Sequence, residues 1–169
     1  KRPRVSGMTK NHNNYLRKID ESVITICTGP AGTGKTYMAC GKAAEMLFAG
    51  KVERIILTRP LMPCGESLGF LPGDQDSKVA PYMRPMIDHL KSFISAKEVT
   101  KLLENETIEC IPLAFMQGLT FHNSFIIMDE AQNASDEQLH MFLTRFGQNA
   151  KVVLNGSVNQ TNVHRAGGN

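Results

Sequence analysis

The stretch of sequence that decides the fold is Gly29-Pro30-Ala31-Gly32-Thr33-Gly34-Lys35-Thr36. It matches the pattern G-x-x-x-x-G-K-[ST], in which glycines let backbone N–H groups converge on the oxygens of a phosphate chain. In this pattern the lysine reaches the β- and γ-phosphates, and the threonine offers its hydroxyl to Mg²⁺. The sequence therefore predicts a phosphate-binding loop at residues 29–36.

The residues on either side of this loop fit a strand and a helix. Val23-Ile24-Thr25-Ile26-Cys27-Thr28 is a β-branched apolar run, which predicts a buried strand. Good helix formers run from Lys35 to Ala49 and stop at Gly50. Their apolar members are spaced to form one stripe: Met38, Ala39, Ala43, Met46 and Leu47. A glycine turn that merely caps a core helix is the alternative, and the strand and helix together favour the phosphate site.

Further apolar runs indicate that strands and helices alternate along the chain. Strands are expected at residues 54–58, 108–111, 125–128 and 151–154. Helices are expected at residues 81–94, 96–103 and 136–146, the last capped by Ser135 and closed by Gly147. This alternation predicts an α/β fold with a largely parallel sheet covered on both faces, a three-layer sandwich. The segment from Pro60 to Gly73 is too broken by proline and glycine for regular structure, and a loop of that length is usually functional.

Composition excludes several classes of protein. The 169 residues fit a single domain, and 41% hydrophobic with 21% charged residues is ordinary for a soluble globular chain. No apolar run approaches the roughly 18 residues of a membrane span, and no apolar stretch follows the basic N-terminus, so we expect a cytoplasmic protein without a membrane partner. The four cysteines have no metal-knuckle spacing, which favours reduced thiols. A net charge of +3 permits a nucleic-acid surface without indicating one.

A second chemical motif follows a later strand. Phe125-Ile126-Ile127-Met128 ends in Asp129 and Glu130, and the carboxyl end of a parallel strand is where ligand crevices of α/β sheets lie. Asp129 is expected to serve Mg²⁺ together with Thr36, and Glu130 to orient or deprotonate an attacking water. An acidic pair that only caps a helix is the alternative. The phosphate loop earlier in the chain favours the catalytic interpretation.

Several motifs together closely resemble PhoH-like proteins, the phosphate-starvation-inducible ATPases. Besides residues 29–36, the resemblance rests on Leu57-Thr58-Arg59-Pro60, residues 65–73 (GESLGFLPG), Pro81-Tyr82, Asp129-Glu130-Ala131-Gln132-Asn133 and Leu143-Thr144-Arg145. It covers nearly the whole chain, and residues 59–73 are more specific than the phosphate loop. The resemblance implies a P-loop NTPase with a RecA-like core similar to the first motor domain of superfamily one helicases. It also implies ATP and Mg²⁺ as cofactors, ATP hydrolysis, and a link to single-stranded RNA.

The resemblance assigns roles to further residues. Lys35, Thr36, Asp129 and Glu130 keep the roles given above. Gln160 is expected to sense the γ-phosphate, with a solvated loop amide as the alternative. Candidates for a charge-stabilising arginine are Arg59, Arg84 and Arg145, each with a structural ion pair as the alternative. Because the helicases take this arginine from a second motor domain, we expect a homo-oligomeric ring, such as a hexamer, in which a neighbour supplies it.

Adenine contacts are expected in the N-terminal segment of residues 1–20. There the run Asn11-His12-Asn13-Asn14 replaces a glutamine that helicase-like proteins use to read adenine. Asn13 is expected to take over with a shorter reach, and Tyr15 to stack on the base. Tyr37, directly after the loop, completes the expected nucleotide contacts.

Departures from the family pattern leave alternatives open. Gly156-Ser157 stands where Gly-Asp is usual, Asn162-Val163 where Asp-Leu-Pro is common, and Gln117-Gly118 where Arg-Gly is usual. Family members continue through another helix and strand, so we expect residue 169 not to be the natural C-terminus. The leading hypothesis is an ATPase acting on RNA, helicase-like or assisting RNA processing. An ATP-gated assembly or regulatory module with slow hydrolysis is the alternative, and a small-molecule P-loop kinase is a third.

Overall fold

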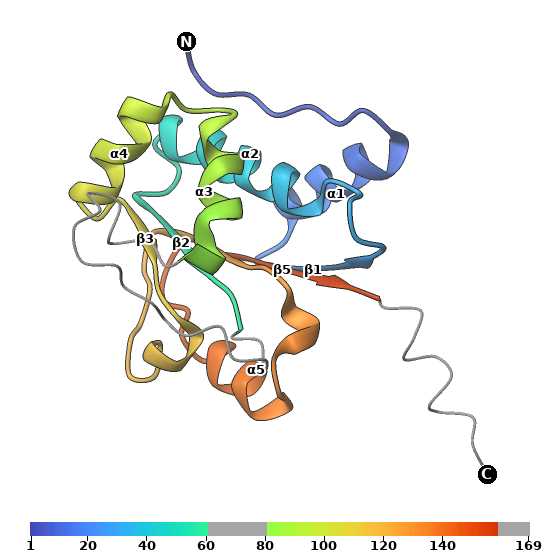
Figure 1. Ribbon diagram of the computed structural model, residues 1–169, viewed down its shortest axis with the longest axis vertical. Helices are drawn as coiled ribbons and strands as arrows, with labels where there is room; N and C mark the ends of the chain where they lie inside the picture. Colours follow the sequence, from blue (N-terminus) through green and yellow to red (C-terminus); the bar gives the residue numbers. More distant parts are fainter. Residues whose placement is uncertain (61–80, 159–169) are drawn as a thin grey trace.

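A sheet of five parallel strands forms the centre of the computed structural model, which describes residues 1–60 and 81–158 (Figure 1). In the sheet the strands lie in the order β1-β5-β4-β2-β3. Their bounds are β1 Ile24–Gly29, β2 Arg54–Thr58, β3 Ile108–Cys110, β4 Ser124–Met128 and β5 Lys151–Ser157. Every pairing between neighbours is parallel, which confirms the predicted α/β class and parallel sheet.

Helices cover both faces of this sheet. One face carries α1 (Lys10–Glu21), α2 (Lys35–Phe48), α3 (Arg84–Lys91) and α4 (Ala96–Glu104), and the other carries α5 (Asp136–Phe142) (Figure 1). Short 3₁₀ turns complete the layers: η1 (Pro81–Met83), η2 (Leu113–Phe115) and η3 (Ala131–Asn133). Within the two described ranges, no helix is both long and apolar enough to cross a bilayer.

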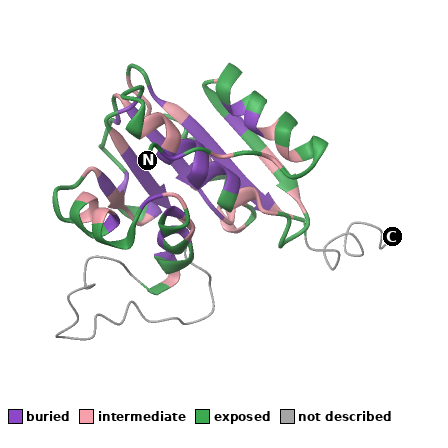
Figure 2. Ribbon diagram, turned by 90° about the horizontal axis from the view of Figure 1, so that it is seen from above, coloured by how far each residue is buried: buried purple, intermediate pink, exposed green. Residues whose placement is uncertain are grey.

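Successive side chains of β4 point to opposite faces of the sheet, and both faces need a helical layer to bury them. Phe125 and Ile127 belong to a buried cluster shared with α2 and α3, whereas Ile126 and Met128 belong to a second cluster shared with Phe142 of α5. All four side chains are fully buried. Figure 2 shows the central strands of the sheet in the colour of buried residues. Successive side chains of a strand point to opposite faces, so a strand that is apolar throughout requires cover on both sides.

β1 is less buried than the sequence predicts. It pairs with β5 and lies at one edge of the sheet among the described residues. Thr25 faces α1 and is buried, whereas Ile24 and Ile26 are 41% and 68% exposed. The expectation of a fully buried strand was therefore wrong for the face that bears these two isoleucines, because no described element covers it.

Two helices also differ from their expected bounds. The segment expected to be helical at residues 81–94 begins with the η1 turn, and its α-helix ends at Lys91. α5 ends at Phe142 rather than at residue 146, because the chain after it pairs with Phe121 instead. The Phe121 amide donates to the Arg145 carbonyl, and the Gly147 amide donates to the Phe121 carbonyl, each at 2.8 Å.

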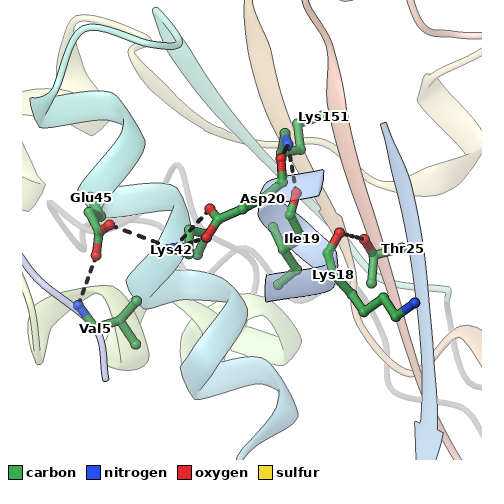
Figure 3. Close-up of polar contacts among 8 residues, drawn as sticks. All are labelled: Val5, Lys18, Ile19, Asp20, Thr25, Lys42, Glu45 and Lys151. Carbon is green, nitrogen blue, oxygen red and sulfur yellow. Dashed lines mark hydrogen bonds and ion pairs between the residues drawn. The ribbon is translucent and has the colours of Figure 1, made fainter. Parts of the chain in front are cut away.

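The C-terminal end of α1 is fixed to its neighbours by lysines (Figure 3). Nζ of the buried Lys42 in α2 lies 3.0 Å from a carboxylate oxygen of Asp20 and 3.5 Å from one of Glu45. Nζ of Lys151, at the start of β5, donates to the carbonyls of Ile19 at 2.6 Å and Asp20 at 2.9 Å. Since a helix C-terminus carries unsatisfied carbonyls and partial negative charge, these lysines stabilise α1.

Candidate functional site

The loop between β1 and α2 has the backbone geometry of an anion cradle. β1 ends at Gly29 and α2 begins at Lys35, so residues 30–34 turn the chain from the sheet edge into a helix N-terminus. Gly32 and Gly34 have φ values of 76° and 84°, in the left-handed region that glycine adopts without steric strain. The N–H groups and partial positive charge at the start of α2 face this turn, which favours a bound anion.

Lys35 folds back over this loop. Its Nζ donates to the carbonyls of Gly29 at 3.1 Å and Pro30 at 2.7 Å, and to the Thr33 hydroxyl at 3.3 Å. All three acceptors belong to the loop itself, so the ammonium group lies at the centre of the turn. We expect phosphate oxygens to compete with these acceptors for the same charge.

Thr36 and Asp129 meet across the cleft. Thr36 lies in the first turn of α2, and Asp129 directly follows β4. The Thr36 hydroxyl donates to Oδ1 of Asp129 at 2.7 Å, although the two residues are 93 positions apart. Asp129 is only 8% exposed. A hydroxyl beside a carboxylate is an oxygen donor pair of the kind that Mg²⁺ prefers, so these residues fit the expected ion.

Glu130 has both carboxylate oxygens engaged. Oε1 lies 3.5 Å from NH2 of Arg59, and Oε2 accepts a hydrogen bond of 2.6 Å from Nε2 of Gln132. Arg59 also places Nε 3.8 Å from Asp129 and donates through NH1 to the Tyr82 carbonyl at 2.7 Å. The two carboxylates are therefore held together by one guanidinium group.

The residues above surround a cleft of about 280 Å³, which we call the phosphate-loop cleft. Its walls are residues 31–37, including Tyr37, together with His89, Asp129, Glu130 and the end of β5 at Asn155, Gly156 and Ser157. Asn155 is 1% exposed, and its Nδ2 has no hydrogen-bond partner among the described residues. A buried donor without a partner is rare in folded proteins, and here it fits a cleft that accepts ligand oxygens.

A second cleft, of about 490 Å³, lies between the same loop and the start of α1, and we call it the α1 cleft. It is lined by Thr9, Asn11, His12, Tyr15 and Cys27 as well as by loop residues. Nε2 of His12 lies 2.9 Å from the Thr33 carbonyl, while Nδ1 accepts the Met8 N–H at 3.3 Å. This pair of contacts requires the proton on Nε2, so His12 donates to the phosphate loop.

Tyr15 connects the two clefts. Its hydroxyl donates to Oδ1 of Asn155 at 2.6 Å, across 140 positions of sequence. Burial raises the pKa of Tyr15, so the phenol keeps its proton and remains a donor. Burial likewise raises the pKa of the Cys27 thiol in the α1 cleft, with Lys35 acting in the opposite direction.

The structure brings together some predicted site residues and not others. Lys35, Thr36, Asp129 and Glu130 share the phosphate-loop cleft, Tyr37 lines it as well, and Tyr15 lines the α1 cleft. Asn13 is absent from both linings, and its Oδ1 accepts the Gly7 N–H at 3.2 Å. Arg145 is also absent from them, and its guanidinium group donates to the Met141 carbonyl and the Thr144 hydroxyl. Gln160 lies outside the described residues.

Sequence reasoning assigned no role to several residues that the structure places at the site, and three of them are His12, Gln132 and Asn155. His12 follows the helix N-cap Thr9 and lies three positions before Tyr15, a spacing that puts both on one face of a helix. Gln132 stands within the motif 129–133 that carried the resemblance. Nothing local in the sequence signals Asn155, because its importance comes from the strand register that sets it beside Cys27.

Comparison with known proteins identifies the family of this chain. A family model described as PhoH-like protein matches residues 4–168. A PhoH-like protein of Synechocystis sp. is 44% identical over 159 residues, 94% of this chain and 48% of the relative. A PhoH-like protein of Mycobacterium tuberculosis is 48% identical over 152 residues (90% and 43%), and Protein PhoH of Escherichia coli (strain K12) is 44% identical over 154 residues (90% and 44%).

The match extends over almost the whole of this chain, whereas the chain spans about half the length of these curated relatives. The motifs that carried the resemblance, the parallel sheet and the phosphate loop all lie inside the matched range. The chain belongs to the PhoH-like protein family.

Proposed function

We propose that this chain binds ATP with Mg²⁺ and hydrolyses it to ADP and phosphate. The observation that carries the proposal is the 2.7 Å contact between Thr36 of the phosphate loop and Asp129. It joins the two motifs at one point and leaves Glu130 as the next residue along the same wall. A phosphate-binding turn, an oxygen donor pair and an adjacent carboxylate are the parts that phosphoryl transfer to water uses.

Each residue has a defined task in this reaction. The loop amides and Lys35 bind the β- and γ-phosphates, and Thr36 and Asp129 would hold Mg²⁺, which neutralises charge on those phosphates. Glu130 accepts a proton from the attacking water as its oxygen forms a bond to the γ-phosphorus. The bond between the γ-phosphorus and the bridging oxygen breaks, and ADP leaves with the electron pair.

Two variants test the proposal. Lys35→Ala removes the charge at the centre of the loop and should weaken ATP binding about 100-fold or more, because charge-assisted hydrogen bonds are lost. Glu130→Gln should keep ATP affinity and lower kcat about 10²- to 10⁴-fold, the usual contribution of a general base. Binding is measured with a fluorescent ATP analogue and turnover by phosphate release. Equal kcat in the wild type and the Glu130 variant would remove Glu130 from the mechanism.

We further propose adenine as the base and the α1 cleft as its place. This cleft borders the phosphate loop and offers the Tyr15 ring together with the polar groups of Asn11 and His12. Competition of ATP and GTP for the same fluorescent nucleotide tests base selectivity. Tyr15→Leu should reduce the preference for ATP, whereas a preference unchanged in that variant would place the base elsewhere.

Single-stranded RNA is the partner that we propose from the family resemblance. An ATPase coupled to RNA should turn over faster when single-stranded RNA is added. A module that uses ATP only to control its assembly should be indifferent to RNA. Measuring kcat with and without a single-stranded oligoribonucleotide separates the two.

The proposed ring is tested separately, by sedimentation. A monomer with full activity would exclude a neighbour that supplies a catalytic arginine.

A further inference from the structure

Arg59 and Gln132 hold the Glu130 carboxylate from two sides. Arg59 directly follows β2 and approaches Oε1, whereas Gln132 lies in η3 after β4 and donates to Oε2. Their distances to the two oxygens are 3.5 Å and 2.6 Å. We call these two side chains the Glu130 clamp.

Each arm of the clamp is anchored at its other end. NH1 of Arg59 donates to the Tyr82 carbonyl at 2.7 Å, which directs Nε and NH2 toward the two carboxylates. Oε1 of Gln132 accepts the N–H of Ser157, at the end of β5, at 2.9 Å. Since β2 and β5 flank β4 on its two sides, the carboxylate is fixed relative to three adjacent strands.

The Glu130 carboxylate depends on these two contacts for its orientation. Glu130 has φ of 52°, in the left-handed region, and its side chain is 32% exposed. Since about a third of the side chain is exposed, close packing does not restrict the carboxylate to one orientation. A general base works only when its oxygen lies within hydrogen-bonding reach of the attacking water, so its orientation must come from neighbouring donors.

We propose that the clamp fixes Glu130 in the orientation in which it acts as the base, which makes Arg59 and Gln132 positioning residues. The inference rests on the proposed ATP hydrolysis. Arg59 is not among the residues that line the phosphate-loop cleft, so it acts through the Glu130 carboxylate rather than on the phosphate. Because it belongs to the same chain as Glu130, the clamp needs no neighbouring subunit.

A first experiment tests the clamp without using turnover. Urea unfolding is measured for Arg59→Ala, for Glu130→Gln and for the double variant that carries both substitutions. A second set measures Gln132→Ala, Glu130→Gln and the double variant of these two. If the contacts exist in solution, each double variant loses less stability than the sum of its single variants. The matched control combines Arg54→Ala with Glu130→Gln, because Arg54 lies at the other end of β2 and pairs with Glu109 at 2.8 Å. Additive losses for both Arg59 and Gln132, like those of the control, would overturn the clamp.

A second experiment tests its role. Arg59→Ala and Gln132→Ala should each lower kcat about 10- to 100-fold, as expected when a supporting hydrogen bond is removed, with KM changed by less than about threefold. Arg59→Lys should restore part of kcat. In a Glu130→Gln background neither substitution should lower the residual single-turnover rate further. A further loss in that background, or an increased kcat in either single variant, would contradict positioning through Glu130.

The two experiments separate the possible failures. A wild-type chain that shows no ATP turnover would refute the proposed function, while the unfolding cycles still decide whether the clamp exists. A working ATPase with additive unfolding effects would refute the clamp alone.

Discussion

Gly34 is the residue at which backbone conformation and binding depend most directly on each other. Its φ of 84° at the N-cap of α2 is a conformation that side-chain-bearing residues adopt at a cost of roughly 1–2 kcal/mol. Among the residues that the structure describes, the nearest atom to a Cβ built there would be Nε2 of His12 at 3.8 Å, so strain rather than collision is the expected penalty.

Gly34→Ala should therefore reduce the free energy of unfolding by about 1 kcal/mol and weaken ATP binding, because the loop amides turn away from the phosphates. Gly50→Ala is the control, since Gly50 has φ of 71° and lies at the far end of α2, where an added Cβ would have no neighbour within 4 Å among the described residues. It should lose similar stability and keep its ATP affinity. Urea unfolding and nucleotide titration measure both, and equal binding losses would contradict the assignment.

The alkylation rate of the Cys27 thiol measures how far the α1 cleft shields this residue from solvent. Burial raises its pKa, so at pH 8 the thiolate fraction, and hence the alkylation rate, should be below that of an ordinary cysteine. The rate should continue to rise with pH beyond the range in which an ordinary thiol is already ionised. Mg²⁺ and ATP should slow the reaction further by covering the cleft.

Iodoacetamide labelling followed by peptide mass spectrometry measures this rate for Cys27 separately from the other thiols. The same chain in denaturant, where burial is lost, provides the reference. A native rate equal to the denatured one at every pH would show that the thiol is not shielded.

Residues that form the site are predictable when they share a local motif and unpredictable when the fold alone joins them. Lys35 and Thr36 stand within one glycine-rich pattern, and Asp129 and Glu130 end one apolar run, so their chemistry is visible in the sequence. The Tyr15–Asn155 contact spans 140 positions and joins α1 to β5, so it depends on the tertiary fold. Arg59 was one of three candidate arginines in the sequence, and only the order of the strands brings it to Glu130.

At the scale of elements, the strands of the sheet follow from their apolar runs, whereas α1 does not. β2 has the predicted bounds and β4 extends the prediction by one residue, because buried parallel strands are continuous apolar runs. α1 is a polar helix that buries only Leu16 and Ile19, so its apolar stripe is too narrow to stand out. Its stability comes instead from tertiary contacts with α2 and β5, which a single sequence does not reveal.

Lys42 tests this dependence of α1 on its neighbours. Lys42→Met keeps the apolar stem of the side chain and removes the ammonium group that pairs with Asp20 and Glu45 (Figure 3). We expect unfolding to require about 1–2 kcal/mol less free energy, since hydrogen bonds to charged groups are lost while Asp20 is half exposed and can be hydrated. Lys97→Met, at an exposed position of α4, should change stability by less than about 0.5 kcal/mol. Equal effects of the two substitutions on urea unfolding would show that α1 does not rely on Lys42.

At the scale of the molecule, the site lies at the carboxyl ends of the strands that carry both buried clusters. β4 contributes side chains to the two clusters alternately and then continues directly into Asp129. The phosphate loop, between β1 and α2, also lies at the carboxyl ends of the strands. Unfolding either layer would therefore disperse the residues of the cleft. A ligand that requires the assembled cleft binds only the folded chain, and mass action then makes it a stabiliser of the whole fold.

This linkage gives a prediction that does not depend on turnover. In the Glu130→Gln variant, Mg²⁺ with ATP at 100 times its Kd should add about 2.7 kcal/mol of stability, and each kcal/mol raises Tm by about 2–4 °C for a chain of this size. We therefore expect Tm to rise by about 5–10 °C in a thermal unfolding scan. ADP at the same concentration should raise it less if the γ-phosphate adds contacts. Lys35→Ala should show a rise of at most about 1–2 °C at that concentration, because binding about 100-fold weaker leaves only ~0.4 kcal/mol of stabilisation. An undiminished rise in this variant would place the nucleotide outside the phosphate-loop cleft.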